Sequence, residues 1–562
     1  MNRRKLLILA GISFFTVTNV FAANNEKGIE YYRADLFGAA KLFFLQQTNQ
    51  SPAEQAENYY YLGQTYYQLN QEDSASYYYQ KAIGLFPEYP YGYIGEGMLQ
   101  LKKGNAKAAE ELFKKATGLA KKDPAVQTTI AEVYVNVGDF ENAKATLDKA
   151  RKINNKFSGI YIVEGDMLMK QVKVGDACAR YENAILFNNT DKVAYLKLAQ
   201  VYKDINTTIA LQYLDKLVAL DPNYIPAYAV YGDIYRDERI RMYSKALDAY
   251  EKFIAIPGVP LLQHERYAQL LFFTNQFEKA AEQIKYVRAN DPDNLVMKRL
   301  EAYTNFHLEK YALGLEQMTR FLELMPQERH IYLDYFTLGQ LALKEKQYEK
   351  ALKAFRKAIE MDSSKTEVLK EAATAATSSE LYPEAIAYYE KYLKLDPSAD
   401  ANDYYAYAKA CYSAAQYFIT PGNVPTDPEA MAKFESDFKN YVKKGDNAYA
   451  EIIKRKPDLY IGYSGRANIN SMLDKFEIDR TGKMTVGYAK PYFDEVLPIL
   501  QNNNGDGSKN SLIIETYRYM ANYYLAVENN MPAVIDYNKK ILQIDPNDEA
   551  AKKTLQLLKV KL

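Results

Sequence analysis

The fold is decided by residues 56–89, AENYYYLGQTYYQLNQEDSASYYYQKAIGLFPEY, in which the apolar residues form two helical stripes. The stripes consist of Tyr59, Leu62 and Tyr66, spaced i, i+3, i+7, and of Ala75, Tyr79 and Ala82, spaced i, i+4, i+7. Because each set falls on one face of a helix, the stretch predicts two amphipathic helices separated by the polar residues 69–73. Gly63 and Ala75 are small enough for the two helices to approach closely, and Pro87 ends the second helix. The stretch is therefore predicted to be one helix-turn-helix unit of about 34 residues.

The same order of small and large apolar residues recurs along most of the chain. Small residues followed by a large one in the second helix are found at Gly97 and Phe113, Gly165 and Tyr181, Gly232 and Tyr250, and Gly339 and Phe355. The spacing resembles the tetratricopeptide repeat. The resemblance implies an all-α fold, a right-handed superhelical solenoid of about 14 helix-turn-helix repeats, whose first helices line a concave groove that binds a protein or peptide.

Four segments are expected from the N-terminus to the C-terminus. They are a signal peptide at 1–22, a regular array of about 11 repeats at 23–397, repeats with insertions at 398–547, and a C-terminal capping helix at 548–562. The insertions are expected at 416–440, 475–487 and 501–511, where the repeat spacing is interrupted. A cap is expected because the last unit of an array otherwise exposes an apolar face.

The first 22 residues have the pattern of a secretory signal. Basic residues at 3–5 precede an apolar run at 6–15, and small residues around Ala22 suit cleavage before Ala23. An uncleaved membrane anchor is the less favoured reading, because Ser13 and Thr16 leave the apolar run shorter than the roughly 20 residues that a span needs. We therefore expect an exported protein, periplasmic or secreted, with no membrane insertion after cleavage.

Composition narrows the class of partner. The 71 basic and 71 acidic side chains leave no net charge, which is not the footprint of a nucleic-acid-binding protein. The two cysteines, Cys178 and Cys411, lie in distant repeats and are expected to be separately buried thiols. The 52 tyrosines, with no tryptophan, fill several positions of the repeat where the family often has tryptophan.

The resemblance also identifies positions on the first helices that would face the groove. The candidate partner-binding residues are Tyr60, Gln64 and Tyr67, then Ile94, Met98 and Leu101, and finally Arg299, Tyr303, Phe306 and His307. Such residue types are enriched at the centres of interfaces, although packing between neighbouring first helices is the favoured reading of the same positions. The charged positions Asp233, Arg236 and Asp237 are interpreted as a solvated face.

No set of residues predicts catalysis, a metal site or a bound cofactor. His264, His307 and His330 lie in separate units without a partner at metal-ligand spacing. Residues 462–466, GYSGR, lack the last glycine of a nucleophile elbow, and the loop from Asn502 has Ile513 where a calcium loop needs Glu. The favoured function is an exported scaffold that binds protein or peptide partners in the bacterial envelope. A glycan-binding protein that uses tyrosine-rich surfaces is the alternative, and an enzyme is the least favoured class.

Overall fold

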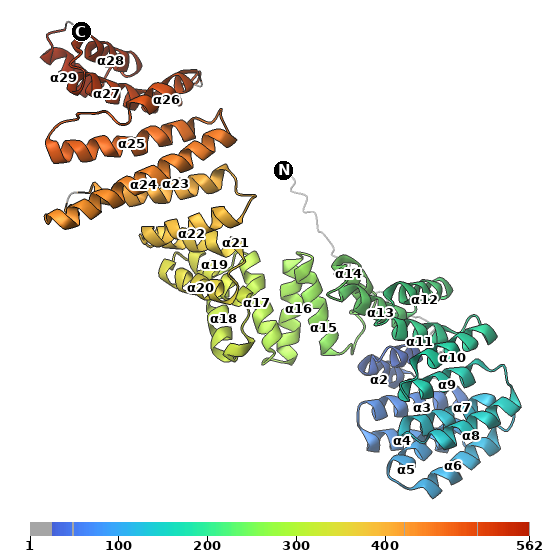
Figure 1. The fold of residues 1–562 in the computed structure, drawn as a ribbon. Helices are drawn as coiled ribbons and strands as arrows, with labels where there is room; N and C mark the ends of the chain where they lie inside the picture. The colour runs from blue at the N-terminus through green and yellow to red at the C-terminus, as the bar shows by residue number, and fades with distance from the viewer. Residues whose placement is uncertain (1–24, 48–49, 421, 503, 561–562) are drawn as a thin grey trace, which may run out of the picture. The chain divides into compact units, whose positions relative to one another are not determined.

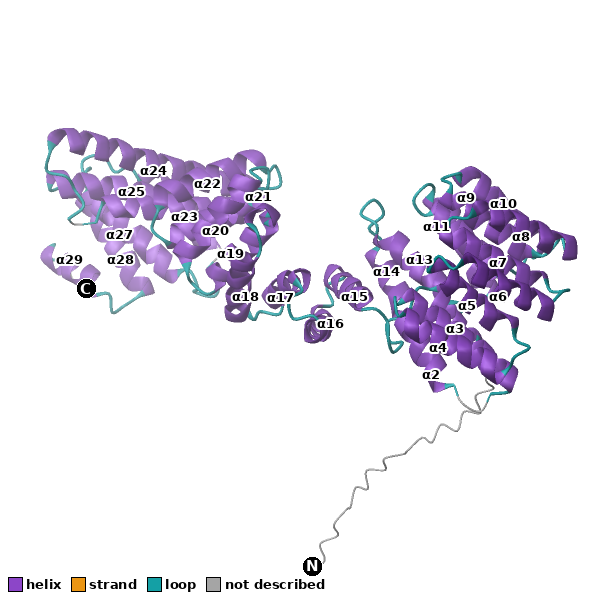
Figure 2. Cartoon of the chain, turned by 90° about the horizontal axis from the view of Figure 1, so that it is seen from below, coloured by secondary structure: helices purple, strands orange, loops and turns teal. Residues whose placement is uncertain are grey.

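The computed structural model describes residues 25–47, 50–420, 422–502 and 504–560, and the predicted signal peptide lies outside them. Every regular element in these ranges is helical, as the repeat spacing predicts (Figures 1 and 2). None of the described helices is both long and apolar enough to cross a bilayer. The all-α fold of successive helix pairs is confirmed.

The chain divides into two compact units, residues 1–297 and 298–562, and the boundary falls near the start of α17. The helices of the first unit are α1 (Glu26–Arg33), α2 (Phe37–Gln46), α3 (Pro52–Gln68), α4 (Glu72–Leu85), α5 (Pro90–Lys102), α6 (Ala106–Leu119), α7 (Pro124–Val137), α8 (Phe140–Ile153), α9 (Ser158–Lys170), α10 (Val174–Phe187), α11 (Lys192–Tyr202), α12 (Thr207–Leu220), α13 (Ile225–Arg236), α14 (Tyr243–Glu251), α15 (Leu261–Phe273) and α16 (Phe277–Asn290). The remaining elements are α17 (Leu295–His307), α18 (Tyr311–Leu324), the 3-10 turn η1 (Gln327–Arg329), α19 (Tyr332–Lys344), α20 (Tyr348–Met361), α21 (Thr366–Ser378), α22 (Tyr382–Leu395), α23 (Ala401–Phe418), α24 (Pro428–Arg455), α25 (Tyr460–Thr481), α26 (Lys490–Asn502), α27 (Asn510–Ala526), α28 (Met531–Ile544) and α29 (Glu549–Leu557).

The two helices of a pair touch where the sequence has its small residues. In α3 and α4, Gly63 lies directly against the ring of Tyr79, which is fully buried. A Cβ at Gly232 of α13 would lie 2.7 Å from the ring of Tyr250 in α14. Because a methyl group would overlap an aromatic ring at both crossings, the small residue and the large residue of the repeat are required together.

The first helix pair has packing partners on both sides. Besides packing on α3, α1 contacts α13. Leu36, just before α2, and Ala39, within α2, belong to an apolar cluster with Ile225, Leu247, Tyr250, Phe253 and Val259. Gly38 lies against the backbone of Gly258, in the loop between α14 and α15. The first seven helix pairs therefore close on themselves within the first unit. The spacing of the repeats in the sequence does not predict this contact between distant helix pairs.

An ionic contact reinforces this closure. The Nζ of Lys192, at the start of α11, lies 2.8 Å from Asp221, 3.5 Å from Glu26 and 3.6 Å from Glu30. Glu26 and Glu30 belong to α1, whereas Asp221 follows α12. One ammonium group thus connects α1 to a part of the chain more than 160 residues away.

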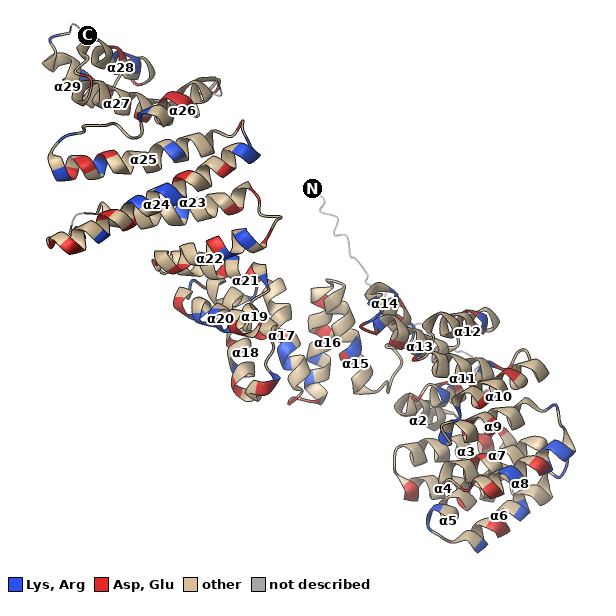
Figure 3. Ribbon diagram, in the orientation of Figure 1, with Lys and Arg blue, Asp and Glu red and all other residues tan. Residues whose placement is uncertain are grey.

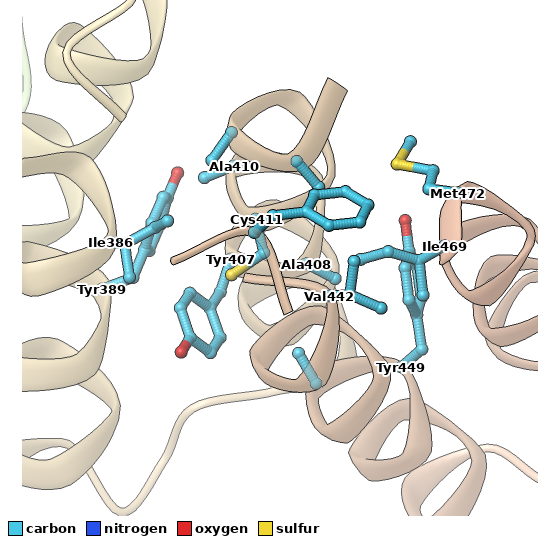
Figure 4. Close-up of a cluster of buried hydrophobic side chains, with 14 of the residues drawn as sticks. Ile386, Tyr389, Tyr407, Ala408, Ala410, Cys411, Val442, Tyr449, Ile469 and Met472 are labelled. Carbon is cyan, nitrogen blue, oxygen red and sulfur yellow. The ribbon is translucent and has the colours of Figure 1, made fainter. Parts of the chain in front are cut away.

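In the second unit, helices extend into the expected insertions 416–440 and 475–487, whereas most of 501–511 is not helical. The helices α24 and α25 have 28 and 22 residues, and most of 428–441 continues the helix that carries the repeat. The reason is a continuous apolar stripe, in which Phe434 and Phe438 precede Val442 at successive steps of four residues. Figure 4 shows part of the resulting core, in which the ring of Tyr407 of α23 lies toward Tyr389 of α22, whereas Val442, Tyr449 and Ile469 of α24 and α25 lie on the other side of α23.

The turn after α25 is held by one buried carboxylate. Asp474 is 2% exposed and accepts hydrogen bonds from the backbone N–H groups of Tyr488 (2.6 Å) and Ala489 (3.0 Å). The hydroxyl of Tyr519 donates a third, at 2.7 Å. This irregular turn is therefore tied to both α25 and α27.

Candidate partner-binding surface

The groove-facing candidates of α3 differ in how much solvent they meet. Tyr60 is 7% exposed, and its hydroxyl oxygen accepts a hydrogen bond of 2.9 Å from Nε2 of Gln64. Burial raises the pKa of Tyr60 well above its ordinary value. Gln64 and Tyr67 are half-buried, and the Nζ of Lys102 lies 4.9 Å from the ring centroid of Tyr67. Of these three, Tyr60 is a packing residue, and Gln64 and Tyr67 keep a surface that a partner could contact.

The candidates of α5 are more deeply buried. Ile94 is fully buried and Met98 is 3% exposed, and both belong to the apolar cluster that contains Tyr60. Leu101, one turn further along α5, is half-buried. Packing between first helices, the reading that the sequence favours, is the role that the structure shows for Tyr60, Ile94 and Met98. A binding role for the more exposed positions stays a prediction.

The candidates of α17 belong to the second unit, and two of them bind a buried carboxylate. The hydroxyl of Tyr303 donates to Oδ1 of Asp334 at 2.6 Å, and Nη2 of Arg299 donates to Oδ2 at 3.0 Å. Asp334, in α19, is fully buried. Burial and the neighbouring charge of Asp334 raise the pKa of Tyr303. Arg299 and Tyr303 thus connect α17 to α19.

The last two candidates of α17 are less buried. Phe306 is half-buried and its ring meets that of Tyr311 at a centroid distance of 6.0 Å, and His307 is exposed. The ten predicted residues therefore divide between two units, with the α3 and α5 sets sharing one cluster.

A charged pocket in the first unit brings together residues from three separate helix pairs. Its volume is about 220 Å³, and it is lined by Lys203, Asp204, Asp233, Ile234, Arg236, Asp237, Arg239, Ile240 and Arg266. The pocket lies at the ends of α11 and α13 and beside α15, the first helices of three consecutive pairs. Asp233, Arg236 and Asp237, read from the sequence as a solvated face, are part of this pocket. In the sequence, this pocket is indicated by a basic residue near the end of each of two successive first helices, namely Lys203 and Arg236.

The ion pairs inside the pocket differ in the distance between the charged groups. Arg239 binds Asp237 through Nε at 2.8 Å and Nη2 at 3.0 Å, and this contact lowers the pKa of Asp237 to about 2. Asp233 instead faces three cations at longer range, with Arg266 at 3.3 Å, Lys203 at 3.6 Å and Arg236 at 3.8 Å. The single carboxylate of Asp233 therefore lies within 4 Å of three cationic groups.

Two of the histidines considered as metal ligands form hydrogen bonds with neighbouring side chains and backbone. His264 contacts Gln283 at 3.1 Å, and His330 lies 2.9 Å from both the Tyr335 hydroxyl and the Met325 carbonyl oxygen. Within the described ranges, no cluster of three or more His, Cys, Asp or Glu residues has the arrangement needed to hold a metal ion. Figure 3 shows basic and acidic residues interspersed along the helices of both units.

Comparison with known proteins identifies the repeat. Tetratricopeptide repeat family models match residues 60–124, 336–400, 100–160 and 193–224. A homologue of the protein CTR9 from Arabidopsis thaliana is 25% identical over 351 residues, which are 60% of this chain and 29% of that protein. The chain thus matches less than a third of the length of this relative.

The chain was also matched to solved structures, among them two of tetratricopeptide repeat proteins. The C-terminal part of one from Cytophaga hutchinsonii is 21% identical, with a TM-score of 0.37, and the match covers 52% of this chain and 99% of that chain. Another, from Parabacteroides merdae, is 17% identical with a TM-score of 0.28 and covers 45% of this chain and 98% of its own. Since the family models match residues 60–160 and 193–224 of the first unit and 336–400 of the second, and both units consist of helix pairs, both units contain tetratricopeptide repeats.

Proposed function

We propose that this protein is an exported scaffold that binds protein or peptide partners in the bacterial cell envelope. The observation that carries the proposal is the array of helix pairs, because tetratricopeptide repeat proteins commonly bind protein partners through such arrays. The signal-like residues 1–22 support export, to the periplasm or the medium. The function is proposed to be non-catalytic, since the family consists generally of scaffolds.

Crosslinking in intact cells, followed by identification of captured proteins, tests this proposal. The expected result is the recovery of the same partner in independent captures, with Tyr67→Ala and Leu101→Ala reducing it because both side chains retain exposed surface beside a buried cluster. Tyr60 and Met98 are unsuitable for this purpose, because truncating a buried side chain destabilises the fold itself.

Tyr77→Ala is the matched control, since Tyr77 is 53% exposed but lies on the second helix α4. If no protein is captured, the scaffold proposal is wrong. If a partner is lost equally in the Tyr77 and Tyr67 variants, binding is not on the first-helix face.

The glycan-binding alternative rests on the many tyrosines. Several of their rings are already covered by other side chains, as in the stacked pair of Tyr66 and Tyr78 at 5.3 Å and that of Tyr202 and Tyr213 at 6.0 Å. This leaves fewer free ring faces for sugars, so the scaffold is favoured. Specific binding on a glycan array would reverse that preference.

A further inference from the structure

The α1–α2 pair lies against the inner side of the first unit, which the first helices of its pairs line. Besides its contact with α13, α1 ends at Arg33, whose charge acts on Glu132 of α7. Asp35, in the turn after α1, acts in the same way on Lys197 of α11. Since α7, α11 and α13 are the first helices of the fourth, sixth and seventh pairs, the end of α1 lies opposite helices that are distant in the sequence.

Glu132 indicates that the inner side is enclosed but accessible to solvent. Its side chain is exposed. The surrounding helices nevertheless raise the pKa of Glu132, first by enclosing it and second through the charge of Asp166 in α9. The charge of Glu132 also adds to the effect of burial in raising the pKa of Tyr32 in α1 and of Tyr60 in α3. Helices α1, α3 and α9 therefore surround one solvent-exposed carboxylate of α7.

An apolar contact and an ionic contact hold the α1–α2 pair to the far side of this space. Leu36 and Ala39 pack against α13 and α14, and the Nζ of Lys192 lies 3.5 Å from Glu26 and 3.6 Å from Glu30. The helices α1 and α2 have only 8 and 10 residues, whereas α3 and α4 have 17 and 14. A terminal pair of a repeat array has one neighbour along the array, so it opens at a lower free energy than an interior pair.

We propose that the α1–α2 pair is a latch that closes the inner side of the first unit, and that large partners reach this side only while the latch is open. The inference rests on the proposed function, because the first-helix face is where a partner of the scaffold would bind. A partner on this face would compete with the contact between α1 and α13. Its apparent affinity would therefore be reduced by the fraction of molecules in which the latch is open.

Cysteine labelling of the mature chain, whose own two cysteines are buried, tests the latch with two reagents of different size. The reagents are N-ethylmaleimide and ubiquitin that carries one maleimide. The reporter is Glu132→Cys, and the matched control is Glu141→Cys, at an exposed position of α8 in the same helix pair. We expect N-ethylmaleimide to modify both cysteines at similar rates. The ubiquitin reagent should modify Glu132→Cys at least about tenfold more slowly than Glu141→Cys, because a minor open state is populated to about 10% or less.

Loosening the latch should reduce this difference. In the chain with Glu132→Cys, Gly38→Ala should speed the reaction with the ubiquitin reagent about fivefold or more, because a Cβ at Gly38 meets the backbone of Gly258. Gly84→Ala is the control and should leave the rate unchanged, since its Cβ would have no heavy atom within 4 Å. Lys192→Gln is the second latch variant, for use if circular dichroism shows that Gly38→Ala disturbs the fold.

Three results would overturn the inference. Equal rates of the ubiquitin reagent at the two cysteines would mean that the inner side is open. Slow modification of Glu132→Cys by both reagents would mean that this position is buried and not merely enclosed. A rate of the ubiquitin reagent that neither Gly38→Ala nor Lys192→Gln raises would mean that the enclosure does not depend on the latch.

Labelling does not involve the partner, so it separates this inference from the proposed function. If the latch variants speed labelling but crosslinking captures no protein, the latch stands and the scaffold proposal is wrong. If a partner is captured but the ubiquitin reagent reacts equally at both cysteines, the scaffold stands and the latch is wrong.

Discussion

The closure of the first unit on itself leads to a sharp prediction at Gly38. A Cβ at this position would lie closer than 3.0 Å to the carbonyl oxygen of Gly258, a distance that real Cβ atoms essentially never show. A Cβ at Gly258 would in turn lie 2.7 Å from the carbonyl carbon of Gly38, so the two backbones are in direct contact. Because neither atom belongs to a side chain that can rotate away, Gly38→Ala must displace α2 from the α14–α15 loop.

The cost can be bounded from the contacts that depend on this approach. Overpacking a tight contact costs about 1–3 kcal/mol, and alanine in a helix recovers up to about 1 kcal/mol relative to glycine. If α2 moves away, Leu36 and Ala39, both 2% exposed, lose part of their burial against α13 and α14. We therefore expect Gly38→Ala to lower the free energy of local opening at α1 and α2 by about 1–2 kcal/mol.

Hydrogen exchange of residues 26–46, measured by mass spectrometry, reports this local opening. Thermal unfolding of the whole chain is less suitable, because a long repeat array does not unfold in a single two-state step. Gly84→Ala is the matched control, because its Cβ would have no heavy atom within 4 Å and the exchange of α1 and α2 should not change. Unchanged or slower exchange in Gly38→Ala would refute the close packing of the first pair against the α14–α15 loop.

Three further outcomes follow from the structure. Lys192 holds the pKa of Asp221 below its ordinary value, so this ion pair adds stability above the ordinary Asp pKa of about 3.9 and loses it as the pH falls further; exchange at the start of α11, corrected for its intrinsic rate, should rise in acid, and Asp221→Asn should weaken that dependence. Burial raises the pKa of the Cys411 thiol to about 12 and also raises that of Cys178, so the folded protein should not react with a thiol reagent at about pH 8, whereas two thiols should react in denaturant. Phe438→Ala, in the core shared by α23, α24 and α25, should lower the stability of the second unit by about 3–5 kcal/mol in chemical denaturation, whereas Tyr417→Ala, at a side chain that is 54% exposed, should change it by less than about 0.5 kcal/mol.

The candidate site was only partly predictable. Groove-facing positions follow from the register of the repeat, but whether a side chain there meets solvent depends on how closely the next first helix approaches. Tyr60 and Met98 are buried because α3 and α5 share one cluster, whereas Arg236 borders a pocket because the cations around Asp233 remain loosely paired. Burial and ion pairing at these positions depend on the distances between helices, and the apolar periodicity within one helix does not predict those distances.

The sequence by itself determined the helix pairs. Each pair is specified locally, by apolar stripes of helical period and by a glycine in one helix matched to an aromatic ring in the other, as with Gly63 and Tyr79. The closure of α1 and α2 against α13 was decided only by the tertiary structure. It depends on the small rotation between successive pairs added over seven of them, which brings Gly38 and Lys192 to partners that no local pattern connects to them.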